Sequence, residues 1–183
     1  STEKLRSVFS KLFNPTCRAY FVYFSDDACF SYRGKDGKVH IYNVDIATCD
    51  ASHGTRLFEL LIQITPPHHR HIMEELIDQL RAPFTVRNPD KRAGKDEKVK
   101  LQANRIRLFS GSTITTLINN LANILIGTSL AENIDTLDGT GESLIRIVRL
   151  TGYDITVDTC EIYEDIQFLK NSPCLDIHGV WQP

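Results

Sequence analysis

The chain has 183 residues, of which 42% are hydrophobic and 24% are charged, a composition typical of a globular domain. Its length allows one domain, or one domain with a modest insertion, and no apolar run reaches the roughly 18 residues that a membrane span needs. The net charge of -2 is unevenly spread, because residues 87–107 hold eight lysines or arginines against three acidic residues. Five cysteines without a Cys-x-x-Cys pair argue against a disulfide framework or a structural zinc site, and they predict a reducing compartment.

The first third of the chain predicts one helix followed by three strands. Apolar residues at helical spacing begin near Leu5, and Asn14-Pro15 ends the helix. Aromatic and β-branched runs separated by turn residues then predict strands over residues 19–24, 28–32 and 38–46.

The rest of the chain predicts mainly helices. Apolar periodicity places helices near residues 55–64, 72–80, 112–130 and 141–150, two short extended pieces within 83–108, and closing strands near 153–157 and 161–169. For the long helix 112–130 we expect Ile114, Leu117, Ile118, Leu121, Ile124 and Leu125 on the buried side. This order predicts a mixed α+β fold and not the regular alternation of a parallel sheet.

The turn Ser25-Asp26-Asp27 joins two hydrophobic strands. Aspartate favours hairpin turns for local hydrogen-bonding reasons, so a plain turn is one interpretation. Two adjacent carboxylates at the tip of a ribbon also repel each other, and a bound divalent cation relieves that repulsion. A metal site at Asp26 and Asp27 is therefore the alternative.

A second pair of carboxylates, Asp45 and Asp50, lies at the end of the third strand and five residues later. The spacing alone is weak, because a chain with this many aspartates is expected to contain such a pair by chance. The strand leading to Asp45 is apolar, however, and a charge at its end needs a metal or a cationic partner if it is buried.

The third candidate site is Ser110-Gly111 with Thr115 and Asn119, at the start of the long helix. Glycine permits close approach of the backbone and serine can cap a helix. Thr115, Asn119 and Asn123 recur every four residues, so they share one helical face. This stripe is either the polar surface of the helix or a site for a neutral polar ligand such as ribose.

Together these segments resemble the motifs of viral RNA-directed RNA polymerases. Residues 45–50 resemble motif A, residues 110–119 resemble motif B at each of its signature positions, and Ser25-Asp26-Asp27 resembles motif C in its Ser-Asp-Asp form. Residues 141–157 occupy the place of motif D, and residues 168–170 resemble the motif E primer grip. Motif C precedes motif A here, an order that resembles the permuted polymerases of birnaviruses and permuted tetra-like viruses.

The resemblance implies a polymerase palm, an antiparallel ferredoxin-like or RRM-like sheet backed by helices with permuted connectivity. It implies nucleotidyl transfer with two Mg²⁺ or Mn²⁺ ions held by Asp26, Asp27 and Asp45. The residues implied to bind the nucleotide are Asp50, Ser110, Gly111, Thr115 and Asn119, and the one implied to contact the primer is Lys170. Motif D normally carries a lysine thought to act as general acid, but no lysine lies between Lys100 and Lys170.

We expect residues 1–183 to be one palm domain. Its parts would be motif C at 19–32, motif A at 38–53, a fingers-side insertion at about 83–108, motif B at 110–130 and motifs D and E at 141–170. The expected partners are RNA template and primer, ribonucleoside triphosphates, and fingers and thumb segments, without which the palm is expected to be inactive. The expected location is the host cytoplasm or the interior of the virion.

Two other interpretations remain open. A palm-type reverse transcriptase would usually carry a bulky residue where this chain has Asp50. A non-catalytic RRM-like module would bind RNA through exposed aromatic residues on its sheet, and Phe21 and Tyr23 could serve that purpose.

Overall fold

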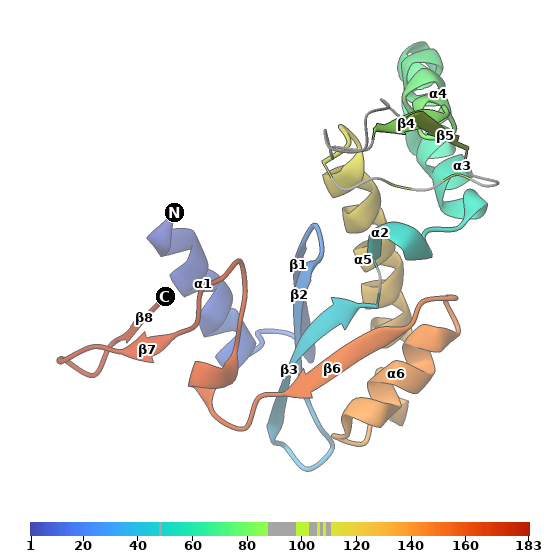
Figure 1. The fold of residues 1–183 in the computed structure, drawn as a ribbon. Coiled ribbons are helices and arrows are strands. Elements are labelled where there is room, and N and C mark those ends of the chain that lie inside the picture. Colours follow the sequence, from blue (N-terminus) through green and yellow to red (C-terminus); the bar gives the residue numbers. More distant parts are fainter. Residues whose placement is uncertain (48, 88–97, 103–105, 107, 109–110) are drawn as a thin grey trace.

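The computed structural model describes residues 1–47, 49–87, 98–102, 106, 108 and 111–183. Its centre is an antiparallel sheet in the order β1-β2-β3-β6 (Figure 1). The strands are β1 (Ala19–Phe24), β2 (Asp27–Arg33), β3 (Val39–Ile46) and β6 (Ile155–Thr159). Helices lie against the sheet, so the fold is mixed α+β, as the sequence predicted.

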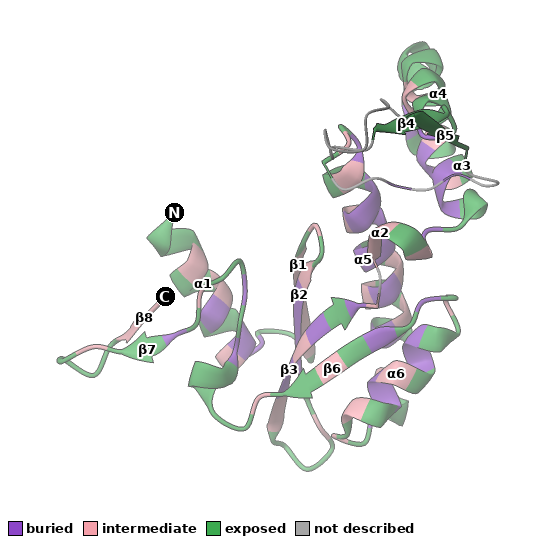
Figure 2. Cartoon of the chain, in the orientation of Figure 1, coloured by how far each residue is buried: buried purple, intermediate pink, exposed green. Residues whose placement is uncertain are grey.

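One face of the sheet carries the main core. Successive residues of a strand point to opposite faces, and alternate positions of β2 and β3, such as Phe30, Tyr42 and Val44, are apolar and buried. Helices α5 (Thr115–Glu132) and α6 (Gly141–Arg149) pack against the strands on this face, and α3 (Thr55–Ile64) packs on α5 and extends the same core. At the end of β3 a single exposed residue, Asp45, lies between two buried ones (Figure 2).

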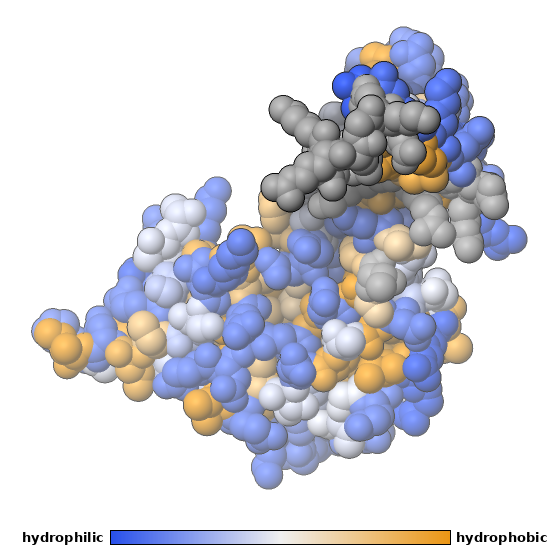
Figure 3. Space-filling model, viewed as in Figure 1, coloured by the Kyte–Doolittle hydropathy of each residue, from blue (hydrophilic) through white to orange (hydrophobic). Residues whose placement is uncertain are grey.

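The opposite face is only partly covered. Helix α1 (Thr2–Phe13) places Phe9 and Leu12 against Cys29 and Ile41, and the segment after β6 adds Ile166 and Phe168 to this second, smaller core. The end of this face that is nearest the β1–β2 turn has no such cover, and the candidate site lies there. Figure 3 shows hydrophilic side chains over much of the visible surface around β3 and β6.

A lobe projects from the sheet between β3 and α5 (Figure 1). Its elements are α2 (Cys49–Ser52), α3, the 3-10 helix η1 (Pro67–His69), α4 (Arg70–Gln79), β4 (Phe84–Arg87) and β5 (Lys98–Leu101). The two extended pieces expected within 83–108 are thus an antiparallel ribbon. Most of the basic residues expected beside it lie outside the described residues.

The expected strand over 161–169 is wrong. The remaining elements are η3 (Ile134–Thr136), η4 (Tyr163–Asp165), β7 (Cys174–Leu175) and β8 (Trp181–Gln182). The segment after β6 is bound to the sheet by the side chain of Asn43 in β3, and not by the backbone pairing of a strand. The Asn43 amide donates to the Asp165 carbonyl over 2.8 Å, and its oxygen accepts from the Gln167 N–H over 2.9 Å. Within the described part of the chain, no helix combines the length and apolar character that crossing a membrane requires.

Candidate functional site

The β1–β2 turn and the end of β3 lie at the same edge of the sheet. Ser25, with φ of 56°, and Asp26 form a two-residue turn, and Phe24 pairs with Asp27 on either side of it. In the next ladder Asp27 is the direct cross-strand partner of Asp45. The structure therefore brings together the three carboxylates that the sequence had placed in separate segments.

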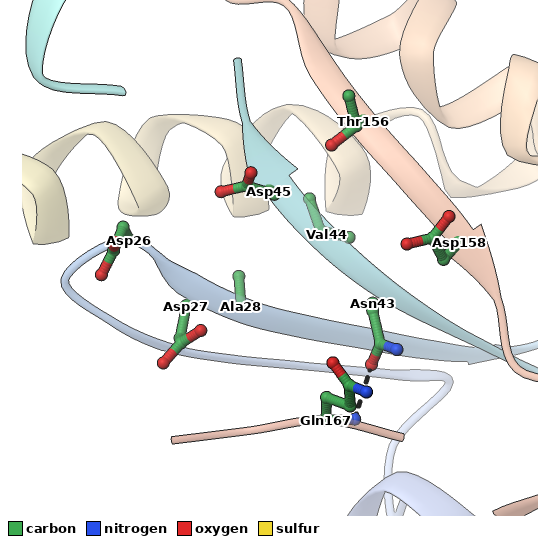
Figure 4. A pocket seen from close by; sticks show the side chains of 9 residues that line it. All are labelled: Asp26, Asp27, Ala28, Asn43, Val44, Asp45, Thr156, Asp158 and Gln167. Atoms are coloured by element: carbon green, nitrogen blue, oxygen red, sulfur yellow. Dashed lines mark hydrogen bonds between the residues drawn. The ribbon is translucent and has the colours of Figure 1, made fainter. Parts of the chain in front are cut away.

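These carboxylates line a shallow pocket on the partly covered face (Figure 4). Residues that are direct partners across strands share a face, so Asp45 is flanked by Asp27 on β2 and Thr156 on β6. Further along the same face lie Asn43 and Asp158, which pair with each other. The complete lining is Asp26, Asp27, Ala28, Asn43, Val44, Asp45, Thr156, Asp158 and Gln167.

Two carboxylates at this edge, Asp27 and Asp45, have raised pKa values, first because of burial and then because of repulsion by neighbouring aspartates. Burial raises the pKa of Asp45, and the negative charges of Asp26 and Asp27 raise it further. Burial and the Asp26 charge also raise the pKa of Asp27, while the Leu169 N–H and the Lys170 charge oppose that increase. The edge therefore favours the arrival of a proton or a cation.

A tight turn brings Lys170 to the site. Phe168 and Asn171 form an isolated antiparallel bridge, and Leu169 and Lys170 between them have φ of 51° and 60°. The Leu169 N–H lies near enough to the Asp27 carboxylate to lower its pKa, so this turn lies beside the edge that carries Asp26, Asp27 and Asp45. Lys170 is exposed next to that edge, where it could contact a phosphate backbone.

The three carboxylates do not converge on one point. Figure 4 shows their side chains pointing in different directions around the rim of the pocket. In the described part of the chain, no group of three or more His, Cys, Asp or Glu side chains is arranged to hold a metal ion. Their chemistry still fits Mg²⁺ or Mn²⁺, which prefer carboxylate oxygens, and Asp26 and Asp45 are exposed and can change rotamer.

Helix α5 holds the acidic turn in place through asparagines. Asn120 accepts from the Ser25 N–H over 2.8 Å, and the Asn123 amide donates to the Ser25 carbonyl over 2.7 Å. The Asn119 amide donates to the Ser25 hydroxyl over 3.4 Å. The position of the turn is thus set by a helix almost a hundred residues away in sequence.

Asn119 also joins the turn to Asp50. Its amide nitrogen lies 3.4 Å from an Asp50 carboxylate oxygen, and its amide oxygen lies 2.7 Å from His53 Nε2. The other ring nitrogen of His53 lies 3.0 Å from the Tyr153 hydroxyl. The two residues expected to read the sugar therefore lie side by side and are connected to a buried histidine.

The start of α5 is described only in part. Ser110 lies outside the described residues, while Gly111 has φ of +83°, which a residue with a side chain rarely adopts. The Thr115 hydroxyl lies 2.7 Å from the Ser112 hydroxyl.

The expected buried side of α5 is partly wrong. Leu117 and Ile124 are 45% and 46% exposed, whereas Asn119 and Asn123 are each 1% exposed. The apolar pattern predicted the wrong buried side because the turn with Ser25 and Asp26 lies against this helix. The backbone of that turn needs hydrogen-bond partners, which the asparagines of the helix supply. Asn119 and Asn123 are therefore not part of a solvated surface of the helix.

Sequence reasoning missed several residues of the site. Asp158 follows the expected strand 153–157 by one position, and its alternation with Thr156 could have placed it beside Asp45. His53 and Tyr153 carry no such signal, because each is a single residue next to a helix or strand.

The aromatic residues Phe21 and Tyr23 do not form an open face. Both lie against the main core, and Gly127 of α5 approaches the Phe21 ring so closely that a Cβ there would lie 2.9 Å from it. The stacking surface that an RRM-like module needs is thus covered by α5 on this side of the sheet.

Comparison with known proteins finds no family model that matches this chain and no curated protein that matches its sequence.

Proposed function

We propose that this chain is the catalytic palm of an RNA-directed RNA polymerase whose metal-binding hairpin precedes its other motifs. The observation that carries the proposal is the pairing of Asp27 with Asp45, with Asp26 on the adjoining turn. Segments that resemble motifs C and A thus lie next to each other, as catalysis by a shared pair of metal ions requires.

The permuted order is physically simple in this sheet. Strand β2 runs directly into β3 through the short connection 34–38, and the two strands are antiparallel neighbours. A hairpin placed before motif A therefore needs no crossover to bring its tip beside Asp45. This supports a palm in the permuted arrangement.

The acidic edge is proposed to hold two Mg²⁺ or Mn²⁺ ions through Asp26, Asp27 and Asp45. When bound, such ions activate the primer 3′-hydroxyl and neutralise charge on the triphosphate. The raised pKa values of Asp27 and Asp45 agree with a site that is electrostatically incomplete without cations.

Asp50 and Asn119 are proposed to recognise the ribose 2′-hydroxyl. The carboxylate can accept from this hydroxyl and the amide can donate to it, and the two groups are 3.4 Å apart. Discrimination against deoxynucleotides would follow, because these groups lose a partner when the hydroxyl is absent. A carboxylate at this position also disfavours a reverse transcriptase.

The chain is proposed to act with further fingers and thumb segments. The lobe with β4 and β5 would face the fingers, and Lys170 beside Asp27 would contact the primer strand. RNA template, RNA primer and ribonucleoside triphosphates are the proposed partners, in the host cytoplasm or the virion interior.

Primer extension by a polymerase that contains this chain tests the proposal. Asp45→Asn and Asp26→Asn should each lower RNA synthesis with Mg²⁺ or Mn²⁺ by a factor on the order of 10³ or more. Asp78→Asn, on the exposed surface of α4, is the control and should leave synthesis unchanged. Near-normal synthesis by either active-site variant would refute the assignment.

A further inference from the structure

His53 is buried at the junction of the candidate site with the main core. It lies between α2 and α3, is 6% exposed, and uses both ring nitrogens. No step of nucleotidyl transfer proposed above employs it. A buried imidazole between two hydrogen-bonding partners therefore calls for an explanation of its own.

The partners of His53 fix its tautomer. The oxygen of the Asn119 amide can only accept, so Nε2 carries the hydrogen and donates to it over 2.7 Å. Nδ1 then accepts from the Tyr153 hydroxyl over 3.0 Å. Burial lowers the pKa of His53, which agrees with this neutral form.

The Asp50 carboxylate fixes the orientation of the Asn119 amide, because it only accepts and therefore faces the NH₂ group. With its oxygen toward His53, its NH₂ group faces Asp50 and Ser25, each over 3.4 Å. Those contacts are long and weak, whereas the contact with His53 is short. When Asp50 turns to a ligand, His53 is the group that still holds the amide.

We propose that His53 is a positioning residue for sugar recognition, which presents the Asn119 NH₂ group toward the nucleotide binding side. This inference rests on the proposed function of Asp50 and Asn119. Three hydrogen bonds connect Tyr153, His53, Asn119 and Asp50 in series, and they link the segment before β6 to the proposed sugar site. Selection of ribose thus depends on a residue that does not touch the nucleotide.

Two amide variants separate this role from simple core stability. In His53→Gln the side-chain NH₂ reaches the place of Nε2 and can still donate to Asn119. In His53→Asn the shorter amide reaches only the place of Nδ1, toward Tyr153. Both remove the ring, and Asn is one methylene shorter, so a purely structural role predicts a lower Tm for His53→Asn but the same ratio of ATP to 2′-deoxyATP affinity in the two variants.

Calorimetry on the full 183-residue chain with Mn²⁺ and either ATP or 2′-deoxyATP measures the effect. Wild type should prefer ATP, and His53→Asn should lower the ratio of the two affinities by about tenfold, the factor for one lost hydrogen bond to a polar group. His53→Gln should restore most of the preference. Thermal melts of the variants show whether each is folded.

The outcomes are distinct. Equal ATP preference in wild type and both variants overturns the role of His53 and leaves the proposed function standing. A wild-type chain that binds neither nucleotide, or both equally, contradicts the sugar site itself and the inference with it. If His53→Asn does not fold, the ¹⁵N shifts of wild-type His53 decide, because an Nδ1–H tautomer contradicts the proposal and an Nε2–H tautomer supports it.

Discussion

The two faces of the central sheet are built from the same strands, but one face forms the main core and the other carries the candidate site. On one face Phe30, Tyr42 and Val44 are buried under helices, and on the other Asp27 and Asp45 line an open pocket. The boundary runs between sequence neighbours, because the side chains of a strand alternate. Asp45 is therefore fixed between two buried neighbours, Val44 and Ile46, that take no part in chemistry.

The largest loss of stability is expected from a substitution on the face of the sheet that carries the main core. Tyr42→Ala removes a side chain that is fully buried and whose hydroxyl donates to the Gly139 carbonyl over 2.7 Å. We expect a loss of about 3–5 kcal/mol in the free energy of unfolding, or roughly 10 °C in Tm. Tyr42→Phe, which loses only the hydrogen bond, should cost about 1 kcal/mol. Equal Tm values for the two variants would contradict this division of the sheet.

The second prediction concerns the connection between α5 and the acidic turn. Asn123→Ala removes a buried donor and leaves the Ser25 carbonyl without that partner, at a cost of about 1–3 kcal/mol measured by denaturant unfolding. Thr128→Ala on the same helix changes an exposed hydroxyl and should stay within about 0.5 kcal/mol. Equal and small losses of unfolding free energy in the two variants would contradict the role of Asn123 in holding the turn.

A smaller loss of stability is expected at Gly111, whose φ is positive, and Gly54, whose φ is negative, serves as the comparison. Gly111→Ala forces a side chain into φ of +83° and should cost about 1 kcal/mol, or 2–4 °C in Tm. Gly54→Ala, at the N-cap of α3, has φ of -84° and open space around the added Cβ, so it should cost less than Gly111→Ala, at most a few tenths of a kcal/mol. Thermal melts of the pair test whether the start of α5 depends on its unusual turn.

The smallest change in stability is expected at the edge with Asp26, Asp27 and Asp45, where a substitution should raise Tm instead of lowering it. The pKa of Asp45 is raised in the folded chain, so the folded state holds the proton more tightly than the unfolded state. The resulting destabilisation is present above the raised pKa and disappears as pH falls below the ordinary pKa of an aspartate. Asp45→Asn should therefore raise Tm by about 1–2 °C at pH 7, and the gain should vanish in acid. A variant less stable than wild type at pH 7 would mean that Asp45 supports the fold.

Much of the fold could be predicted because it rests on local patterns. The alternation that ends at Asp45, the turn at Asp26 and the helix break at Pro15 each depend on a few consecutive residues. The carboxylates Asp26, Asp27 and Asp45 could be proposed for the same reason, since two of them lie at the turn between two strands and one lies next to the end of a strand.

The rest depends on contacts between distant segments. Asn119 and Asn123 are buried because the backbone of the turn needs partners, and Asn43 replaces a strand ladder with side-chain bonds. His53 acquires its role only when Tyr153 and Asn119 are brought to it. Periodicity reports which residues avoid water, but it does not report which buried polar groups will meet.

Manganese binding to the isolated chain tests the central claim most directly. In ¹⁵N NMR spectra, substoichiometric Mn²⁺ should broaden first the amides around Asp26, Asp27 and Asp45, at the edge where the two ladders meet. The same titration of Asp45→Asn should show this local broadening greatly reduced while the rest of the spectrum is unchanged. Broadening that begins elsewhere, for example around the exposed residues His68 and His69, or that is identical in wild type and variant, would contradict a metal-binding palm.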